Sequence, residues 1–461
     1  MRYDEIEKIV LDRIKPSKEE YEKGYRIYNK VKEALERGLK RHKIPGKVSL
    51  QGSFAKDTWI SGELDLDVFV LFPEEYSREW LETTGFRIIL ESLKDYNYIV
   101  KYAAHPYITV KVEDVDVDVV PAFDVRNPAQ IKSAVDRTPY HTKYVNSKLT
   151  LRQRDEVRLL KKFMKGIGVY GAEIKVEGFS GYLVELLIIH YGSFRSVLTE
   201  ASEWQPPVII DIEGYHKPRE LVRKFRNKDL VVVDPVDPNR NVAAAVSRRS
   251  FATFIAASRR YLEKPSLSYF FPSYPEIDLL RVLSLRKTSM VVVLFDISSL
   301  RIAPDILWGE LKRTMKGLVR FIESNDFKVI DYDSWSNEKD LALIIIELEE
   351  RMLSPYTLHI GPPVHNREYS DKFIKKYLED NTVYGPWISF DGRWRILKPR
   401  RYRDVHDLLQ SNIKALIKAP DLSRVPVRVV DLLELKEIID KDEKLRIWIN
   451  RFVYKKPSWL L

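Results

Sequence analysis

Residues 62–72 read Gly-Glu-Leu-Asp-Leu-Asp-Val-Phe-Val-Leu-Phe, an apolar run that carries two aspartates. The alternation predicts a strand from Leu64 to Phe72, because successive side chains of a strand point to opposite faces. Asp65 and Asp67 then share one face, while the alternate leucines and valines enter a core. Neighbouring carboxylates repel each other and strands disfavour aspartate, so we expect a divalent cation to offset this cost.

A second segment repeats this pattern. Residues 115–120 read Val-Asp-Val-Asp-Val-Val, with Asp116 and Asp118 on one face. If the two strands pair, three or four carboxylates meet in one place, and such oxygen-rich sites suit Mg²⁺. One such strand alone is most often an amphipathic strand with a wet face. Two of them inside valine and leucine runs favour a metal site.

A turn that suits phosphate binding precedes the first aspartate pair. Gly52 and Ser53 follow an expected strand at Val48–Leu50 and open a short helix-like stretch. Such a turn presents backbone N–H groups and a hydroxyl to phosphate oxygens. A Gly-Ser pair alone is usually an ordinary turn. Followed twelve residues after Ser53 by Asp65, and later by a third strand aspartate, it indicates a triphosphate site.

Helices and strands alternate along the rest of the chain. Ser17 and Glu20 form a capping box, and with an apolar stripe at helical spacing they predict a helix over residues 17–42. Further helices are expected at 78–92, 152–165 and 306–323. Further strands are expected at 98–103, 107–112, 115–120, 208–212, 230–233, 289–296 and 341–348.

The domain organisation follows from these elements and from an aromatic, proline-rich boundary at 265–275. We predict an α+β multidomain fold. A catalytic domain is expected over 1–148, a mostly helical central domain over 149–264 and a C-terminal α+β body and tail over 265–461. The last hundred residues are mixed, and their topology is left unassigned.

Composition excludes several classes of protein. The 461 residues include no cysteine, which removes disulfides, thiol nucleophiles and thiolate metal sites and fits an intracellular, cytoplasmic protein. The charged N-terminus is unlike a secretory signal, and no apolar run is long enough to span a membrane. With 77 Lys+Arg against 67 Asp+Glu, the net charge of +10 makes a polyanionic partner plausible.

The order of Gly-Ser, Asp-x-Asp and a third strand aspartate resembles the nucleotidyltransferase superfamily of DNA polymerase beta. Longer strings are similar to the archaeal, class I CCA-adding enzymes, in collinear order from about residue 50 to 245 and more faintly afterwards. They include Gln-Gly-Ser-Phe-Ala-Lys-Asp-Thr-Trp (51–59), Tyr-Ala-Ala-His-Pro-Tyr (102–107), Val-Asp-Val-Val-Pro (117–121), Ser-Ala-Val-Asp-Arg-Thr-Pro (133–139), Tyr-Gly-Ala-Glu (170–173), Gly-Phe-Ser-Gly-Tyr (178–182) and Asp-Pro-Val-Asp (234–237).

This resemblance implies a polymerase-beta-like palm in the first domain. It also implies template-independent restoration of the 3′-terminal CCA of tRNA from CTP and ATP, with release of pyrophosphate. Asp65, Asp67 and Asp118 would hold two Mg²⁺ ions, and Asp118 would also act as base toward the primer hydroxyl. The metals would activate that hydroxyl and hold the triphosphate for in-line attack.

The resemblance further implies a set of nucleotide contacts and partners. Arg240 matches the arginine that reads the base, and the remaining matches contact triphosphate and ribose. The contacts implied are Gly52, Ser53, Lys56, His141, Lys161, Tyr170 and Arg240. The tRNA partner would be held by its acceptor stem, T arm and 3′ end, and a homodimer is expected because the family is commonly dimeric.

Two residues depart from the family pattern. Lys56 stands where the family usually has arginine, which keeps the charge but loses bidentate phosphate geometry. Asp65 stands where some members have glutamate, a change that shortens the reach and still allows metal binding.

Each implied contact also has an ordinary interpretation. His141 suits a surface histidine, Tyr170 a packing residue, and Arg240 an ion pair with Asp234 or Asp237. Lys161 shares a helix face with other cations, a pattern typical of a solvated surface. Asp116 is expected outside the metal site, and His105 is expected to be structural.

Three basic clusters are candidate RNA surfaces, since a tRNA is a large polyanion that is recognised mainly through its phosphates and shape. Any single cluster is also compatible with a plain solvated surface. The clusters are the helix that contains Arg154, Arg158, Lys161 and Lys165, the pairs at 248–249 and 259–260, and the segment 398–403.

Other functions stay open at this stage. The same catalytic domain suits a poly(A) polymerase or an oligoadenylate synthetase, which would not stop after three additions. A DNA-repair polymerase is compatible with the catalytic domain, although no helix-hairpin-helix string follows. A non-catalytic RNA-binding scaffold would be expected to have lost carboxylates, and all three are present.

Overall fold

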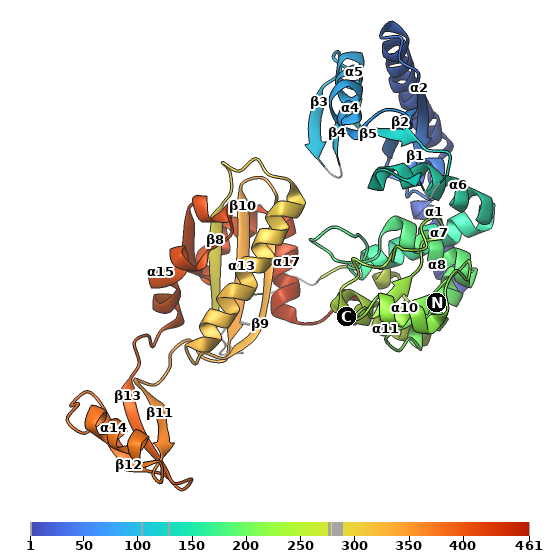
Figure 1. Cartoon of the computed structure of the whole chain (residues 1–461). Helices are drawn as coiled ribbons and strands as arrows, with labels where there is room; N and C mark the ends of the chain where they lie inside the picture. The colour runs from blue at the N-terminus through green and yellow to red at the C-terminus, as the bar shows by residue number, and fades with distance from the viewer. Residues whose placement is uncertain (1, 103–104, 128–129, 275–277, 279–288, 461) are drawn as a thin grey trace. The chain divides into compact units, whose positions relative to one another are not determined.

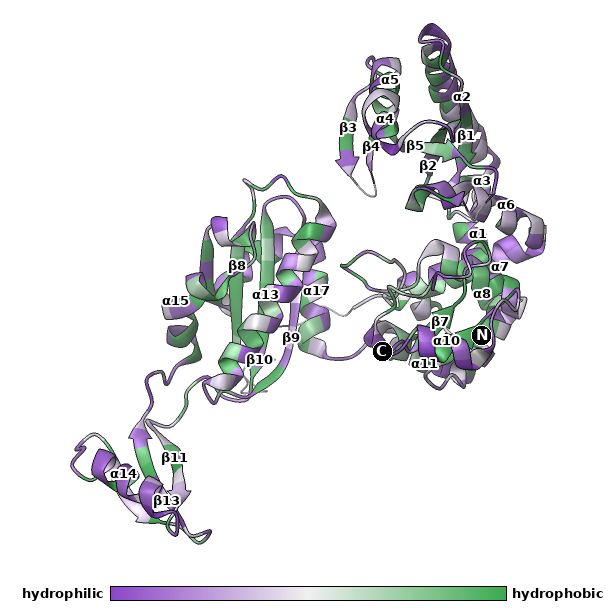
Figure 2. Cartoon of the chain, viewed as in Figure 1, coloured by the Kyte–Doolittle hydropathy of each residue, from purple (hydrophilic) through white to green (hydrophobic). Residues whose placement is uncertain are grey.

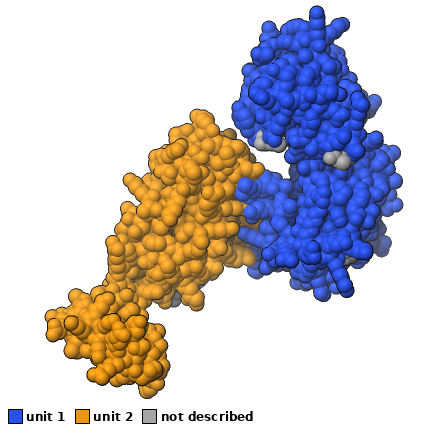
Figure 3. All heavy atoms as spheres, in the orientation of Figure 1, with its two compact units in different colours: residues 1–273, 456–461 blue, residues 274–455 orange. Residues whose placement is uncertain are grey.

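The computed structural model describes residues 2–102, 105–127, 130–274, 278 and 289–460. The chain divides into two compact units (Figure 3). The first contains residues 1–273 together with 456–461, and the second contains residues 274–455. The expected strand 98–103 and the string 102–107 extend into residues 103–104, which lie outside the described residues.

A five-stranded sheet forms the N-terminal part of the first unit, in the order β1-β2-β5-β4-β3 (Figure 1). β2 and β5 are parallel, and the other neighbours are antiparallel. The strands are β1 (Lys47–Gln51), β2 (Asp65–Pro73), β3 (Tyr98–Tyr102), β4 (Pro106–Val112) and β5 (Val115–Asp124). The pairing of the two Asp-x-Asp strands, which the sequence left conditional, is therefore confirmed.

Helices cover one face of this sheet. α2 (Lys18–Arg41) and α5 (Phe86–Ser92) pack on the even-numbered residues of β2, whose Leu66, Val68 and Val70 are buried. Ser17 caps α2 by accepting from the Glu20 N–H while the Glu20 carboxylate accepts from the Ser17 N–H. The odd-numbered face of β2 carries the two aspartates and, further along, a small apolar cluster.

The helix expected at 78–92 is continuous but not regular. It consists of α4 (Arg78–Trp80), a π-helical turn η1 (Leu81–Gly85) and α5. Its outer limits agree with the prediction.

The rest of the first unit is mostly helical around one large core. Its helices are α1 (Tyr3–Ile14), α3 (Gly52–Ala55), η3 (Ala134–Arg137), α6 (Thr138–Lys148), α7 (Leu151–Gly166), α8 (Gly181–Tyr191), α9 (Phe194–Ser202), α10 (Pro218–Lys224), α11 (Arg248–Glu263), η4 (Leu267–Tyr269) and η7 (Ser458–Leu460). Two short parallel strands, β6 (Val208–Ile210) and β7 (Leu230–Val232), complete it. The helix α1 had not been predicted.

A four-stranded antiparallel sheet, β14-β8-β10-β9, organises the second unit. Its strands are β8 (Ser289–Asp296), β9 (Val329–Ser336), β10 (Leu341–Leu348) and β14 (Val427–Asp431). α13 (Pro304–Ser324) and α15 (Val405–Leu416) pack on one face, and α16 (Lys436–Lys441) and α17 (Glu443–Tyr454) pack on the other. Because both faces are covered, β8 and β10 are hydrophobic along most of their length (Figure 2).

A smaller sheet completes the second unit. β11 (Tyr356–Pro363), β13 (Arg393–Pro399) and β12 (Tyr384–Ile388) form it in that order, with α14 (Arg367–Tyr377) packed on one side. The 3₁₀ turns η5 (Leu422–Arg424) and η6 (Leu432–Leu435) lie beside the larger sheet.

The α+β class and the order of a mixed sheet domain, a helical part and a C-terminal α+β part are confirmed. The strands expected at 289–296 and 341–348 agree with β8 and β10. The division at 148 and 264 into three domains stays a prediction, since the first unit contains both of the first two parts. Across the described ranges, no helix is long and apolar enough to cross a membrane.

Candidate active site

The backbone register brings four carboxylates to one face of the sheet. In the parallel pairing of β2 with β5, Asp65 lies opposite Asp116 and Asp67 lies opposite Asp118. Asp65 and Asp116 are exposed, whereas Asp67 and Asp118 are partly buried. The interior pair, Asp67 and Asp118, therefore lies closer to the core than the other two.

Burial and neighbouring carboxylates raise the pKa values of two of these residues, Asp65 and Asp67. Burial, and then the charge of Asp118, raises the pKa of Asp67 to about 6. Burial, followed by Asp116 and Asp118, also raises the pKa of Asp65. Lys56 acts in the opposite direction on the Asp67 pKa, which shows that its ammonium group belongs to the same electrostatic neighbourhood. A cluster of this kind favours a bound cation.

Two neighbours on β4 and β3 orient Asp118. The Thr109 hydroxyl donates to Asp118 Oδ1 from the adjacent strand, and Lys101 Nζ lies 4.0 Å from the same oxygen. Within the described residues, no three His, Asp or Glu side chains already stand in ligating positions. The donors are nonetheless of one kind, carboxylate oxygens on a single face, and this donor set fits Mg²⁺.

The start of α3 lies directly against Asp67. Gly52 has φ +69°, and a Cβ at this position would lie 1.7 Å from Asp67 Oδ2. Gln51 pairs with Asp67 in the β1–β2 ladder, so α3 starts beside the carboxylates. Ser53 follows as the second residue of α3 and is partly buried. Only glycine fits this close approach.

A buried glutamate joins two of the predicted nucleotide contacts. Lys56 Nζ donates to Glu185 Oε2 at 2.6 Å, and Lys161 Nζ lies 3.8 Å from Oε1. Thr58 donates its hydroxyl to Glu185 Oε1 at 2.6 Å and accepts from Lys161 Nζ at 3.2 Å. Burial raises the pKa of Glu185, but the two lysines and the Thr58 hydroxyl together lower it by more, so the carboxylate stays ionised.

A second buried carboxylate, that of Asp234, joins His141 and Arg240. Asp234 Oδ2 lies 3.0 Å from His141 Nε2 and accepts from the Arg240 guanidinium at 2.8 Å, while Oδ1 accepts from the Tyr182 hydroxyl at 3.1 Å. Burial raises the pKa of Asp234, but His141, the Val236 N–H and Arg240 outweigh it and lower the pKa to about 2. Burial lowers the pKa of His141 despite this carboxylate.

The N-terminal end of α8 links the two clusters. Tyr182 stacks on the His141 ring with centroids 3.9 Å apart, and Lys56 Nζ lies 5.8 Å from the Tyr182 centroid. A Cβ on Gly181 would lie 3.0 Å from the Tyr170 hydroxyl and 3.8 Å from Lys161 Nζ. The structure thus brings Lys56, Lys161, Tyr170, His141 and Arg240 together around residues 181–185, with Asp67 beside Lys56.

The spacing of the cations on α7 predicted an exposed basic surface, but two of these cations are buried in the structure. Arg158 is 1% exposed and donates to the carbonyl groups of Asp57 and Trp59, and Lys161 is 3% exposed. Arg154 is also paired with Asp57, and Lys165 with Glu63. Both interpretations, as solvated and as RNA-facing, are therefore wrong for Arg158 and Lys161, which are buried, and stay predictions for Arg154 and Lys165, which are partly buried beside acidic partners.

Glu185 was missed in the sequence, and Tyr182 appeared only inside a longer motif. Residues 183–188 read Leu-Val-Glu-Leu-Leu-Ile, and all six side chains are buried. A single charge inside an entirely apolar helix was the available signal, because such a residue requires a buried partner. His105 is buried, in agreement with a structural role.

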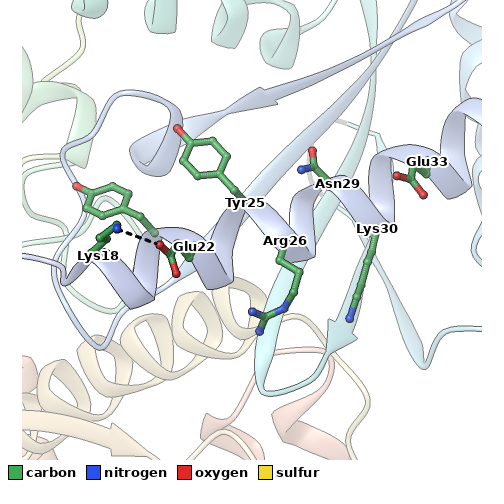
Figure 4. A pocket seen from close by; sticks show the side chains of 8 residues that line it. Lys18, Glu22, Tyr25, Arg26, Asn29, Lys30 and Glu33 are labelled. Carbon is green, nitrogen blue, oxygen red and sulfur yellow. Dashed lines mark ion pairs between the residues drawn. The ribbon is translucent and has the colours of Figure 1, made fainter.

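An open groove of about 600 Å³ lies apart from these residues along α2 (Figure 4). Its side chains lie along one helix, and Lys18 forms an ion pair with Glu22 at 3.6 Å. Arg26 and Lys30 both pair with Glu113 of the β4–β5 turn. The groove contains none of the predicted site residues.

Three family models match consecutive parts of the chain. They are described as a nucleotidyltransferase domain (residues 29–141), a tRNA nucleotidyltransferase second domain (155–271) and a CCA-adding enzyme C-terminal domain (286–419). Their order agrees with the fold class predicted from the sequence.

Whole-length relatives are similar as well. A CCA-adding enzyme of Sulfurisphaera tokodaii is 42% identical over 459 residues, covering 99% of each chain. One of Saccharolobus islandicus is 38% identical over 455 residues, covering 99% of this chain and all of its own. Among solved structures, the Cid1 poly(U) polymerase matches 58% of this chain and 99% of its own at 17% identity, with a TM-score of 0.45, too low to support an argument.

Proposed function

The chain belongs to the CCA-adding enzymes, and from this premise we propose how its own residues carry out the reaction. It is a tRNA nucleotidyltransferase, which adds and repairs the 3′-terminal CCA without a nucleic-acid template, transferring CMP and AMP from CTP and ATP and releasing pyrophosphate. The observation that carries the residue-level proposal is the register of Asp67 with Asp118, beside Lys56.

Asp65, Asp67 and Asp118 would hold the divalent ions, which we propose to be two Mg²⁺. When bound, these ions supply the positive charge that favours ionisation of the attacking 3′-hydroxyl and stabilises the departing pyrophosphate. The raised pKa values of Asp65 and Asp67 support this assignment, because burial and the neighbouring carboxylates disfavour the charged form, which a bound cation would favour. Asp116 lies opposite Asp65 and is exposed like it, and we propose that it stays outside the ligand set because the family resemblance implies only three carboxylate ligands.

Asp118 also has the chemistry to accept the proton of the primer hydroxyl. One of its oxygens is occupied by the Thr109 hydroxyl, which restrains the carboxylate on the sheet face. The other oxygen is then available to the substrate side. This role is proposed in addition to metal binding.

The nucleotide would be held by the groups gathered around residues 181–185. Gly52 leaves space beside Asp67, and the Ser53 hydroxyl and the ammonium groups of Lys56 and Lys161 would bind triphosphate oxygens. His141 and Tyr170 complete the contacts to triphosphate and ribose. The Arg240 guanidinium, anchored at Asp234, would read the edge of the base.

The wider organisation is proposed from the same family membership. The predicted domains would be a catalytic head (1–148), a neck (149–264) and a body with a tail (265–461). The tRNA acceptor stem, T arm and 3′ end would be bound through exposed cations such as those at 398–403. We propose that the enzyme works in the cytoplasm as a homodimer, which light scattering of the purified protein would test.

An incorporation assay tests the function directly. Purified protein, Mg²⁺ and radiolabelled CTP or ATP are incubated with tRNA transcripts that end before, within or after the CCA sequence. We expect addition of C, C and then A, with no further growth, and no incorporation by Asp67→Ala. A long A tail would place the chain with the polyadenylating enzymes, and loss of all incorporation would overturn the proposal.

A further inference from the structure

Glu185 is a fully enclosed charge near the nucleotide contacts. Its side chain is 0% exposed, and its neighbours along α8 are apolar. Each of its oxygens is engaged, Oε2 by Lys56 at 2.6 Å and Oε1 by the Thr58 hydroxyl at 2.6 Å. A carboxylate buried in this way is tolerated only when its partners are fixed.

The charges around Glu185 do not balance. Lys56 lies at 2.6 Å and Lys161 at 3.8 Å, so two ammonium groups share one carboxylate. Arg158 and Lys165 on α7 lie near Lys161 but have acidic partners of their own, Asp57 and Asp155 for Arg158 and Glu63 for Lys165. At Glu185 itself, two ammonium groups are therefore opposed by one carboxylate, an excess of one positive charge.

We propose that Glu185 is a positioning residue for the nucleotide triphosphate. It holds the Lys56 and Lys161 ammonium groups side by side, at a separation that their mutual repulsion would otherwise increase. The unbalanced positive charge faces the incoming triphosphate, which supplies the missing negative charge. This inference rests on the proposed function, because it assumes that the two lysines bind triphosphate oxygens.

The protonation of Lys161 provides a readout that is specific to this role. Burial lowers the pKa of Lys161 to about 8, and Lys56, Arg158 and Lys165 lower it too, whereas Glu185 raises it. Tyr170 also lies close by, beside Gly181. Lys161 is therefore charged below about pH 8 and neutral above it. Removal of Glu185 moves this transition to lower pH.

The test compares Glu185→Gln with the wild-type enzyme from pH 6 to 9.5. Incorporation of CMP into tRNA that lacks CCA gives kcat and KM, and calorimetric titration with a non-hydrolysable CTP analogue gives Kd without tRNA. For Glu185→Gln at pH 7.5 we expect KM and Kd to rise about tenfold or more, with a smaller change in kcat. On the alkaline side, the pH at which kcat/KM begins to fall should decrease by about one unit.

A matched control separates this effect from general damage. Glu310 in the second unit is also buried, and its carboxylate accepts from the backbone N–H groups of Asp421 and Leu422. Glu310→Gln should lower thermal stability and leave the KM for CTP and the pH profile unchanged. If Glu185→Gln behaves like Glu310→Gln, the carboxylate is purely structural and the proposal is wrong.

A double-mutant cycle keeps the proposal testable even where stability suffers. Because Glu185 holds Lys56 against the repulsion of Lys161, Glu185→Gln should raise KM less in a Lys161→Met background than in the wild type, whereas independent effects would multiply and contradict the proposal. If Glu185→Gln does not fold, Lys161→Arg replaces it. The guanidinium does not titrate below pH 10, so the alkaline limb should disappear, and its persistence would overturn the assignment.

Failure of this inference and failure of the proposed function give different results. If the wild-type enzyme adds no nucleotide to any tRNA end, the function is wrong, while the calorimetric Kd and its pH dependence still test Glu185. If the wild-type enzyme adds CCA and the Glu185→Gln variant keeps both Kd and pH profile, only the positioning role is wrong.

Discussion

Asp67 illustrates, at the scale of one residue, the conflict between stability and chemistry. Its carboxylate is partly buried beside Asp118, and its pKa of about 6 shows how strongly the folded chain disfavours the charge. Replacement by an uncharged isostere relieves this repulsion. The same replacement removes an oxygen donor that the proposed metal site requires.

We therefore expect Asp67→Asn to be inactive and more stable than the wild-type protein when no divalent ion is present. Incorporation of CMP should fall by at least about a hundredfold, and the free energy of unfolding of the first unit should rise by roughly 1–2 kcal/mol at pH 7. Thermal melting with and without Mg²⁺ checks the second half. Mg²⁺ should stabilise the wild-type protein and have less effect on the variant.

Two neighbouring aspartates give the comparison. Asp118→Asn should also abolish incorporation, whereas Asp116→Asn should keep most of it, because Asp116 is exposed and lies outside the proposed ligand set. Equal losses for Asp116 and Asp118 would contradict the proposed ligand set.

Residues that act through a motif were visible in the sequence, while their buried partners were not. The aspartates of residues 65–67 break an apolar alternation, which points to chemistry from local pattern alone. Glu185 is defined by Lys56 and Thr58, which lie 129 and 127 positions away in the chain. Local pattern holds no information about such partners, so only the three-dimensional structure identifies it.

At the scale of secondary-structure elements, the first residue of α3 is constrained by its backbone conformation and by a close contact. Gly52 adopts φ +69°, and a Cβ there would overlap Asp67 Oδ2 at 1.7 Å. Gly62, in the turn before β2, adopts φ +78° and has no heavy atom within 4 Å of the Cβ position. Both glycines adopt a positive φ, but only a Cβ at Gly52 would contact a neighbouring residue.

Gly52→Ala should therefore be more harmful than Gly62→Ala. Both substitutions carry the cost of a left-handed alanine, about 1–2 kcal/mol, but only the first displaces Asp67. We expect Gly52→Ala to lose most incorporation activity, and Gly62→Ala to lose stability while retaining activity. Chemical denaturation and the CMP assay measure the two effects. Similar activity in both variants would show that the close approach to Asp67 is unimportant.

The buried residue Arg158 of α7 stabilises the fold by linking this helix to neighbouring segments. Arg158 donates to the Trp59 and Asp57 carbonyl groups, to Asp155 at 2.8 Å and to the Tyr21 hydroxyl at 3.0 Å. It thereby ties α7 to the loop after α3 and to α2. Removal of the guanidinium takes this donor from the buried Trp59 carbonyl and from the partly buried acceptors around it.

Arg158→Met should consequently lower the free energy of unfolding by about 3 kcal/mol. Arg152→Met on the same helix, whose side chain is exposed and only loosely paired with Glu156 at 3.7 Å, should change it by less than about 0.5 kcal/mol. Denaturant titration measures both. The affinity of the folded Arg158→Met protein for tRNA should be unchanged, and a loss confined to tRNA binding would restore the RNA-facing interpretation.

Most elements of the first unit could be predicted because their periodicity is regular, as in α2 and β2. Which strands become neighbours could not, since β2 pairs in parallel with β5 across the intervening α5, β3 and β4. The small sheet of β11, β12 and β13 was left unassigned. Its strands contain Gly-Pro steps and register shifts, so no clear alternation marks them.

At the scale of the whole molecule, the last residues of the chain belong to the unit that contains its start. After the second unit, residues 456–461 rejoin the first unit. There Trp459 is 9% exposed and stacks on Tyr269, with ring centroids 6.0 Å apart, at the edge of the largest core. No sequence pattern predicted this return, because a single tryptophan carries no periodicity.

Trp459→Ala should therefore destabilise the first unit by about 3 kcal/mol, since it removes a large aromatic contact from a core. Because two units with separate cores unfold as separate transitions, calorimetry should show the transition of the first unit at a lower temperature and that of the second unit unmoved. Trp387→Ala supplies the control, as this tryptophan of β12 is 38% exposed. It should leave the first transition in place. If Trp459→Ala lowers only the second transition, the C-terminal residues stabilise the unit that precedes them in the chain, and the division into these two units is wrong.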